Sequence, residues 1–238
     1  MNKQDLLELN PERMARCDLD PEQILRWFNV LDAAWVHSGD PKMPHAELAS
    51  GLCSNGYFNC SKVLCYPNLA EILALQLARK CKLSVGVDLD VWVVGSAYAA
   101  ITFSYEMARV FGYPHGFVEK DPTDPSGKKM KWTERFTMPQ GCSVIQAEEL
   151  ITTAGTFWEV RRAIKEAGHQ PPVCFADTVV ALVHRPPKLP VEYPDGIKVV
   201  ALIEKEVWAV KPEECPLCQA GSKRVKPKTH WAELTGKA

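Results

Sequence analysis

Two adjacent carboxylates and a hydroxyl-rich turn lie close together in the second half of the sequence. Glu148 and Glu149 follow a short apolar run, and residues 152–156 come shortly after them with the sequence Thr-Thr-Ala-Gly-Thr. Small residues let backbone N–H groups converge on an anion, and threonine hydroxyls and a following helix N-terminus favour it further. Such a turn suits a phosphate, whereas the carboxylates suit hydroxyl groups beside it or a divalent cation. A phosphate next to a diol is what a ribose 5-phosphate presents.

The segment that carries these residues must be a strand that ends in a loop and enters a helix. Val144 and Ile145 are typical of a buried strand, and apolar residues recur at helical spacing after residue 156. A generic strand–turn–helix unit with a capped helix has the same pattern, because such turns are frequent in α/β proteins. Both interpretations stay open on this segment alone.

A second unit of the same kind precedes it. Residues 91–94 are an apolar run without alternation, as expected of a central parallel strand, and the small-residue loop 95–98 leads into another helix. This loop could present N–H groups to an anion or be a plain tight turn. The other predicted elements are helices that begin at Pro21 and Pro67, and strands at 117–120, 173–183, 197–203 and 207–210. Alternating strands and helices predict an α/β domain.

A long basic stretch at residues 121–141 interrupts this alternation. It contains several prolines, and loops of this length inside a compact domain are often lids. A solvated hairpin is the simpler alternative. The basic residues that could serve in a lid are Lys120, Lys128, Lys129, Lys131 and Arg135.

Composition narrows the class of protein. The chain has 238 residues and a formal net charge of -1, so it fits one large domain or a domain with an appendage. No overall basic charge points to nucleic acid, and no apolar stretch is long enough to span a bilayer. Since the N-terminus lacks the apolar core of a signal peptide, we expect a cytoplasmic location.

Two of the nine cysteines form a Cys-x-x-Cys motif, Cys215-Pro-Leu-Cys218. This motif is half of a zinc site, and a plain reduced turn is the alternative. The residues that could complete a zinc site in space are Cys53, Cys60, Cys65 and His230.

Taken in order, these motifs resemble those of the type I phosphoribosyltransferases, and most of all the orotate phosphoribosyltransferases. Residues 143–156 resemble the family's phosphoribosyl-pyrophosphate (PRPP) motif, and 94–98 resemble its pyrophosphate loop. The N-terminal signature of the orotate enzymes is matched by Ser50, Gly51, Ser54, Tyr57 and Asn59. The sequence departs from the family patterns at Gln146, Ala147 and Glu149 in the PRPP motif, at Ala49 and Leu52 where cations are usual, and at His184 where an acid is usual.

The resemblance implies an α/β fold of the type I phosphoribosyltransferase (Rossmann-like) class. A parallel sheet would have helices on both faces and a small hood above it. The implied domains are an N-terminal helical extension at 1–44, a hood built from 45–66 and 190–220, a phosphoribosyltransferase core at 67–189 and a basic tail at 221–238.

The resemblance also implies a glycosyltransferase (a pentosyltransferase) of pyrimidine biosynthesis, in which Mg²⁺ helps join a nucleobase to the ribose 5-phosphate of PRPP and pyrophosphate is released. Orotate is the first expected base. A different base, or a non-catalytic regulator that senses PRPP or a nucleotide, are the alternatives. The implied catalytic residues are Glu148, Glu149, Lys120 and Lys128. The implied PRPP-binding residues are Thr152, Thr153, Ala154, Gly155, Thr156, Gly95, Ala97, Tyr98, Lys129 and Lys131. The implied base-binding residues are Ser50, Gly51, Ser54, Tyr57 and Arg185. A homodimer is expected, with no nucleic-acid or membrane partner.

Overall fold

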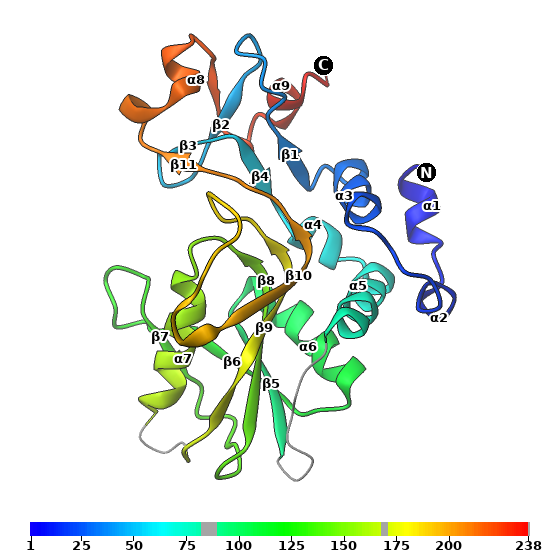
Figure 1. The fold of residues 1–238 in the computed structure, drawn as a ribbon, viewed down its shortest axis with the longest axis vertical. Coiled ribbons are helices and arrows are strands. Elements are labelled where there is room, and N and C mark those ends of the chain that lie inside the picture. The colour runs from blue at the N-terminus through cyan, green and yellow to red at the C-terminus, as the bar shows by residue number, and fades with distance from the viewer. Residues whose placement is uncertain (82–89, 168–170, 238) are drawn as a thin grey trace.

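The computed structural model describes residues 1–81, 90–167 and 171–237, and divides them into two stacked parts (Figure 1). A large twisted sheet with flanking helices forms the lower part. Short strands and small helices form the upper part, which also contains the C-terminus. No helix of the described chain is both long enough and apolar enough to cross a bilayer.

The lower part is built on a six-stranded sheet with the order β10-β9-β8-β5-β6-β7. Five of these strands are parallel, and the edge strand β7 is antiparallel to β6. The strands are β5 (Val91–Ser96), β6 (His115–Lys120), β7 (Met130–Trp132), β8 (Ser143–Ile151), β9 (Cys174–His184) and β10 (Lys198–Glu204). The predicted parallel sheet is therefore confirmed, and the two apolar runs within 173–183 are one continuous strand.

Helices cover both faces of this sheet, as predicted. Helices α5 (Pro67–Lys80) and α6 (Ala99–Phe111) pack on one face, and α7 (Gly155–Lys165) packs on the other (Figure 1). Neighbouring residues of β8 show the alternation, because Ile145 joins the core under α5 and α6 while Val144 joins the core with Val160 of α7. The sheet is thus buried on both sides, which explains its unbroken apolar strands.

The upper part contains a four-stranded sheet with the order β11-β3-β2-β12 and a two-stranded ribbon of β1 and β4. Its strands are β1 (Ala34–Val36), β2 (His45–Glu47), β3 (Cys53–Ser54), β4 (Gly56–Phe58), β11 (Ala209–Val210) and β12 (Arg224–Val225). The structure differs from the expected hood in one respect. Strand β10 pairs with β9 in the core sheet, so 198–204 belongs to the lower part.

The remaining helices are short. Helix α3 (Pro21–Val30) begins as predicted, with Asp20 and Gln23 forming a capping box and Pro21 at the first helical position. The expected basic tail at 221–238 contains β12 and a helix, and Leu234 packs against Ala46 and Val225 of the upper sheet. The other short elements are α1 (Lys3–Leu7), α2 (Pro11–Met14), α4 (Ser61–Leu64), η1 (Pro194–Gly196), η2 (Pro212–Glu214), α8 (Pro216–Gln219) and α9 (Trp231–Thr235).

The basic stretch forms a hairpin with its own hydrogen bonds. Strands β6 and β7 pair antiparallel, and the Asp124 carboxylate at the hairpin tip accepts from the backbone N–H groups of Lys128 and Lys129 at 2.9 and 2.7 Å. The Met130 N–H donates to Glu159 Oε1 of α7 at 2.8 Å. The hairpin interpretation of this stretch is therefore confirmed, and its base is anchored on α7.

Candidate active site

The five parallel strands end at the edge of the core sheet nearest the upper part, and the ends of β5, β6, β8 and β9, with the loops that follow, carry the candidate residues (Figure 1). In open α/β sheets, ligands bind outside the carboxyl ends of the strands. The turn after β8 leads into α7 through Ala154, whose backbone is left-handed with a φ of 61°. No side chain caps α7, so its N-terminal N–H groups face the loop without a competing partner from a capping residue.

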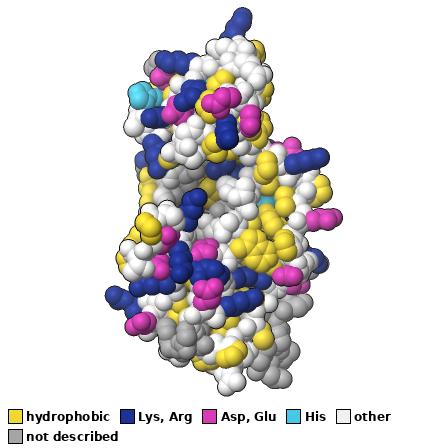
Figure 2. Space-filling model, turned by 90° about the vertical axis from the view of Figure 1, so that its left-hand side faces the viewer, with side chains coloured by type: hydrophobic (Ala, Val, Ile, Leu, Met, Phe, Trp, Pro, Cys, Tyr) yellow, Lys and Arg dark blue, Asp and Glu magenta, His cyan; other side chains and the backbone are white. Residues whose placement is uncertain are grey.

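A cavity of about 840 Å³ lies between this turn and the tip of the hairpin. Figure 2 shows Lys and Arg side chains gathered with Asp and Glu on this face of the molecule. Arg162 is neutralised there, because it pairs with Glu159 and Glu166. The residues that line the cavity are Lys120, Asp124, Ser126, Lys128, Lys129, Thr152, Thr153, Gly155, Thr156, Glu159, Arg162 and Glu166. The structure thus brings three predicted lid lysines to the predicted phosphate turn.

The other two basic candidates lie elsewhere. Lys131 is on β7, and its Nζ lies 3.8 Å from a carboxylate oxygen of Glu119 on the neighbouring strand. Arg135 is exposed beyond the end of β7. Neither lines the cavity with the phosphate turn.

The carboxylates lie near the end of β8, which continues for two residues beyond Glu149 to Ile151. Because successive strand residues point to opposite faces, Glu148 and Glu149 are directed away from each other. Glu148 is buried and accepts from Ser96 Oγ at 2.6 Å and from Gln146 Nε2 at 3.0 Å. Burial raises the pKa of Glu148 to about 7, although these two hydrogen bonds act in the opposite direction.

The space beside Glu148 is small and opens onto the phosphate turn. Glu148 lines a cavity of about 20 Å³ together with Thr152, Gly155 and Thr156. That volume is close to what one water molecule needs. Glu148 is therefore the carboxylate of the pair that faces the turn.

Glu149 follows Glu148 on β8 and lies beside Cys60, which precedes helix α4. Burial raises the pKa of its carboxyl group, and its carbonyl accepts from the Cys60 thiol at 3.3 Å. The same thiol lies within electrostatic range of both Glu149 and Arg185. This carboxylate is therefore at the boundary between the phosphate turn and the hood.

The loop after β5 contributes differently from what its sequence suggests. A Cβ at Gly95 would lie 2.3 Å from Ser104 Oγ, so the glycine is needed for close packing of β5 against α6. The Ala97 N–H donates to the Val118 carbonyl at 2.7 Å, and only Tyr98, with 81% exposure, projects into solvent. The peptide bond between Ala97 and Tyr98 is cis.

Two functional neighbours were missed in the sequence. Ser96 and Gln146 both hydrogen-bond to Glu148, and Gln146 also donates to the Phe157 carbonyl of α7 at 3.2 Å. Gln146 stood out only as a departure from the family pattern. The period of two along β8 was the signal that could have placed it beside Glu148.

The predicted base-binding residues separate into three places. Arg185 follows β9, its N–H donates to the Ile151 carbonyl at 2.8 Å, and it lies within electrostatic range of Tyr57. Ser50 and Gly51 are exposed on the turn between β2 and β3. Ser54 is buried inside the hood, where its hydroxyl contacts the Trp208 carbonyl at 2.7 Å, so its group is already engaged.

Arg185 is only partly satisfied. Its Nε is buried and has no hydrogen-bond partner within the described chain, and burial lowers the pKa of its guanidinium group. Next to it, His184 contacts Glu204 Oε1 at 3.1 Å and the Tyr193 hydroxyl at 2.9 Å. His184 stands where the family usually has an acid. Its acidic neighbour in this structure is Glu204, which comes from strand β10.

Lysines of the C-terminal segment lie near the N-terminal signature, where Ala49 and Leu52 replace the cations that are usual in the family. A cavity of about 350 Å³ in the upper part is lined by Ala49, Gly51 and Tyr57, and by Lys226 and Lys228. Sequence reasoning assigned these lysines only to a tail. Their position opposite the exposed turn depends on the pairing of β12 with β2, which no local motif indicates.

Cys215 and Cys218 lie far from the phosphate turn, in the upper part. The side chains that meet them there are His45 and Cys53. Of the partners expected from the sequence, Cys53 is therefore the one found, whereas Cys60, Cys65 and His230 are not in this group.

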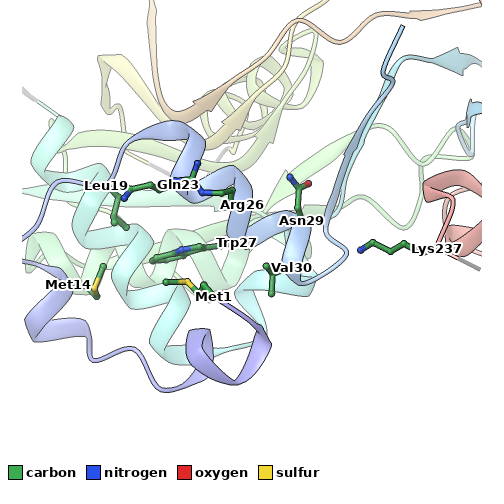
Figure 3. Close-up of a pocket in the computed structure, with 9 residues that line it drawn as sticks. All are labelled: Met1, Met14, Leu19, Gln23, Arg26, Trp27, Asn29, Val30 and Lys237. Atoms are coloured by element: carbon green, nitrogen blue, oxygen red, sulfur yellow. The ribbon is translucent and has the colours of Figure 1, made fainter. Parts of the chain in front are cut away.

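One further hollow, of about 540 Å³, lies among the N-terminal helices. Trp27 forms its floor, with Met14 and Leu19 to one side and Lys237 further off (Figure 3). It contains none of the predicted site residues and no cluster of titratable groups. It is an apolar groove rather than a candidate for catalysis.

Comparison with known proteins places the chain in a family. No family model matches it. It is 34% identical to the orotate phosphoribosyltransferase of Caldicellulosiruptor bescii over 183 residues, which cover 77% of this chain and 87% of that protein. It is 30% identical to the orotate phosphoribosyltransferase of Caldanaerobacter subterraneus over 209 residues, covering 88% and 97% of the two chains.

A solved structure supports the same fold. The orotate phosphoribosyltransferase of Aeropyrum pernix superposes with a TM-score of 0.54 at 17% identity, covering 76% of this chain and 93% of that one. At this identity the superposition shows the fold alone. With the sequence relatives, it establishes that the chain belongs to the orotate phosphoribosyltransferase family.

Proposed function

We propose that this protein transfers the ribose 5-phosphate of PRPP to orotate. A ring nitrogen of the base forms a bond to C1 of the ribose, the bond from C1 to the pyrophosphate oxygen breaks, and pyrophosphate leaves with the bonding electrons. The ring nitrogen that forms the bond loses its proton to water. The observation that carries the proposal is the cavity in which the lysines of the hairpin face the 152–156 turn.

The two phosphate-bearing ends of PRPP suit the two walls of this cavity. The 5-phosphate would lie on the turn, where the hydroxyls of Thr152, Thr153 and Thr156 and the uncapped N-terminus of α7 all offer donors. The pyrophosphate would meet Lys120, Lys128 and Lys129 on the opposite wall. Positioning and charge neutralisation are the main sources of catalysis in such a transfer.

The carboxylates suit the ribose hydroxyls and a magnesium ion. Among the described residues, Glu148 and Glu149 belong to no group of three acidic side chains that could hold a metal by themselves. Mg²⁺ commonly keeps several waters and binds through one or two carboxylates and substrate phosphates. Because Glu148 and Glu149 point to opposite faces of β8, one of them would bind the ion together with the substrate phosphates and water. When bound, Mg²⁺ would neutralise charge on the leaving pyrophosphate, while Glu148 and Glu149 hold the ribose hydroxyls.

Arg185 is the basis for choosing orotate. A buried guanidinium nitrogen without a partner within the described chain favours an anionic ligand, and a carboxylate is the group that arginine binds best through paired hydrogen bonds. Tyr57 adds an aromatic wall nearby. The Zn²⁺ expected at Cys215 and Cys218 would have no part in the transfer, because those residues lie in the upper part.

Pyrophosphate release tests the proposal. Purified protein would be incubated with PRPP, Mg²⁺ and one base at a time from a panel of orotate, uracil, adenine and hypoxanthine. We expect release with orotate, and little with uracil, which is orotate without the carboxylate. Turnover of another base instead would contradict the assignment of orotate. PRPP binding without turnover of any base would identify a regulator.

The homodimer implied by the family resemblance is part of the same proposal. Light scattering at several protein concentrations would measure the mass in solution. A mass that stays at that of one chain would contradict it.

A further inference from the structure

Four side chains of the upper part converge although they come from distant parts of the sequence. His45 on β2, Cys53 on β3, and Cys215 and Cys218 beside and within α8 each direct one ligand atom to a common point, with all four atoms within 4.8 Å of one another. We propose that these four residues bind a structural zinc ion. The proposal is independent of the transfer reaction.

The separations fit tetrahedral zinc. The sulfurs of Cys53 and Cys218 are 3.6 Å apart, and His45 Nε2 lies 3.4 Å from the Cys218 sulfur and 3.7 Å from the Cys215 sulfur. Zinc–sulfur bonds of about 2.3 Å and zinc–nitrogen bonds of about 2.0 Å at tetrahedral angles give about 3.8 Å between sulfurs and about 3.5 Å between nitrogen and sulfur. These three separations therefore match tetrahedral zinc to within a few tenths of an ångström, and all ligand atoms lie within 4.8 Å of one another.

The hydrogen bonds around His45 present the correct nitrogen. Its Nδ1 lies 2.8 Å from Ser222 Oγ, and that hydroxyl donates its single hydrogen to the Met43 carbonyl at 2.6 Å. Since the hydroxyl hydrogen is used, His45 Nδ1 must carry the proton that Ser222 accepts. In the neutral ring the lone pair is then on Nε2, which faces the cysteines. Histidines that bind zinc are usually held by such a partner on the other nitrogen.

The Cys-x-x-Cys turn is arranged as a ligand loop. The Cys218 N–H donates to the Cys215 sulfur at 3.4 Å, a hydrogen bond that would stabilise a thiolate. Cys215, Cys53 and His45 are completely buried, so a metal bound there would be closed off from substrate. Three soft thiolates and one imidazole in four-coordinate geometry select zinc, and four protein ligands are the mark of a structural site.

Such an ion would join three separate segments of the upper part. Strands β2 and β3 carry two ligands, and the C-terminal segment that carries the other two is otherwise held by the short strands β11 and β12. Two-residue strands bury little surface, so a metal crosslink would contribute much of the stability of this part. Tyr57 follows the ligand Cys53 on β4, Lys226 follows the C-terminal ligands, and both line the cavity of about 350 Å³.

Metal analysis tests the proposal directly. Protein purified without chelator from zinc-supplemented medium should contain one zinc ion per chain. Cys218→Ser should lose that zinc, whereas Cys65→Ser, at an exposed cysteine outside the group, should keep it. Absence of zinc above background in the wild type, equal zinc in both variants, or a Cys53–Cys218 disulfide in the native protein would overturn the proposal.

Two further measurements keep the test decisive if Cys218→Ser does not fold. Replacing zinc by Co²⁺ in the wild type should give the intense visible absorption and sulfur-to-cobalt charge transfer of a tetrahedral thiolate site. A weak spectrum typical of oxygen ligands would contradict the proposal.

Ser222→Ala should fold and bind zinc roughly 10- to 100-fold more weakly in competition with a chelator. Unchanged affinity in that variant would contradict the role assigned to His45. All of these readouts are independent of PRPP turnover, so failure of either proposal can be recognised separately.

Discussion

The two parts of the molecule assemble their candidate sites in different ways. At the edge of the core sheet, each set of residues lies at or just after the end of its own strand, and the parallel sheet brings them together because all these strands end at one edge. In the upper part, short strands and turns join residues as far apart as His45 and Cys218. Local motifs are therefore sufficient to locate the first site, whereas only the tertiary structure reveals the second.

The difference extends to how firmly each side chain is held. On the core edge, Glu148 is fixed by Ser96 and Gln146 before any ligand arrives. Near the hood, Arg185 retains a buried nitrogen without a partner within the described residues. We interpret the region around Glu148 as a preorganised half-site for PRPP, and the region around Arg185 as a half-site that is completed when a base binds.

The largest effect is expected where the base half-site depends on one charge. Arg185→Met should lower kcat/KM for orotate by roughly 100- to 1000-fold, because loss of a buried charge pair typically costs 2–5 kcal/mol. The KM for PRPP should change little. Steady-state kinetics with each substrate varied in turn would measure both constants.

Arg79→Met is a matched control for this change. Arg79 is exposed on α5 and pairs with Asp18 at the surface. It should leave both constants near those of the wild type. If Arg185→Met weakened PRPP as much as orotate, the division of the site into two halves would be wrong.

A smaller loss is expected at the boundary between the halves. Glu149→Gln should lower kcat by about 100-fold, since removing one stabilising group in a transferase site commonly has this effect. The substitution keeps the size of the side chain and removes its charge. Stopped-time assays of pyrophosphate release would measure it against Glu213→Gln, at an exposed position on η2. Unchanged kinetics in Glu149→Gln would show that this carboxylate does not take part in the transfer.

The contrast also explains what could be learned from the sequence. The core strands and the helices that begin at Pro21 and Pro67 were predictable, because apolar runs and capping residues act over a few residues. The turn at 152–156 between β8 and α7 was predictable for the same reason. The zinc ligand His45 was not, since neither its spacing nor its neighbours mark it.

A residue that matches a local pattern can also be engaged by another segment of the chain. Gly95 and Ala97 match a phosphate loop in sequence, but the first is required by packing against Ser104 and the second donates its N–H to Val118. Likewise, β10 was assigned to the hood because its pairing with β9 depends on contacts that no local pattern encodes. Local sequence gives the types of group near a site, while tertiary pairing decides which of them remain available.

The preorganised half-site should have a measurable cost in stability. Because burial raises the pKa of Glu148 to about 7 from 4.5, the folded protein holds a proton that the unfolded chain has lost at intermediate pH. Its contribution to stability therefore falls as the pH rises from 4.5 to 7 and stays low above 7. Glu148→Gln should remove this loss, and Gln146 Oε1, which lacks a partner within the described chain, can accept from the new amide.

Urea unfolding at pH 5 and pH 8 would measure the effect. The gain of Glu148→Gln over the wild type should be larger at pH 8 than at pH 5 by up to about 3 kcal/mol, at about 1.4 kcal/mol per pKa unit. Glu213→Gln should show no such difference. A gain that is equal at both pH values would mean that Glu148 is ionised throughout this range.

The smallest effects are expected at two glycines. Gly95 is required for packing, whereas Gly155 is proposed to let a ligand approach the backbone. A Cβ at Gly95 would also lie 3.2 Å from the Ala147 carbonyl, so Gly95→Ala should lose about 1–3 kcal/mol of stability. A Cβ at Gly155 would meet no atom within 4 Å, and this residue begins α7, so Gly155→Ala should gain less than about 1 kcal/mol. PRPP affinity, measured by calorimetry, should nevertheless fall in Gly155→Ala, because the added methyl group lies where the 5-phosphate must approach the backbone. If Gly155→Ala is as stable as the wild type and binds PRPP equally well, the 5-phosphate does not lie at the first turn of α7. The division of the site into two halves would then lose its support.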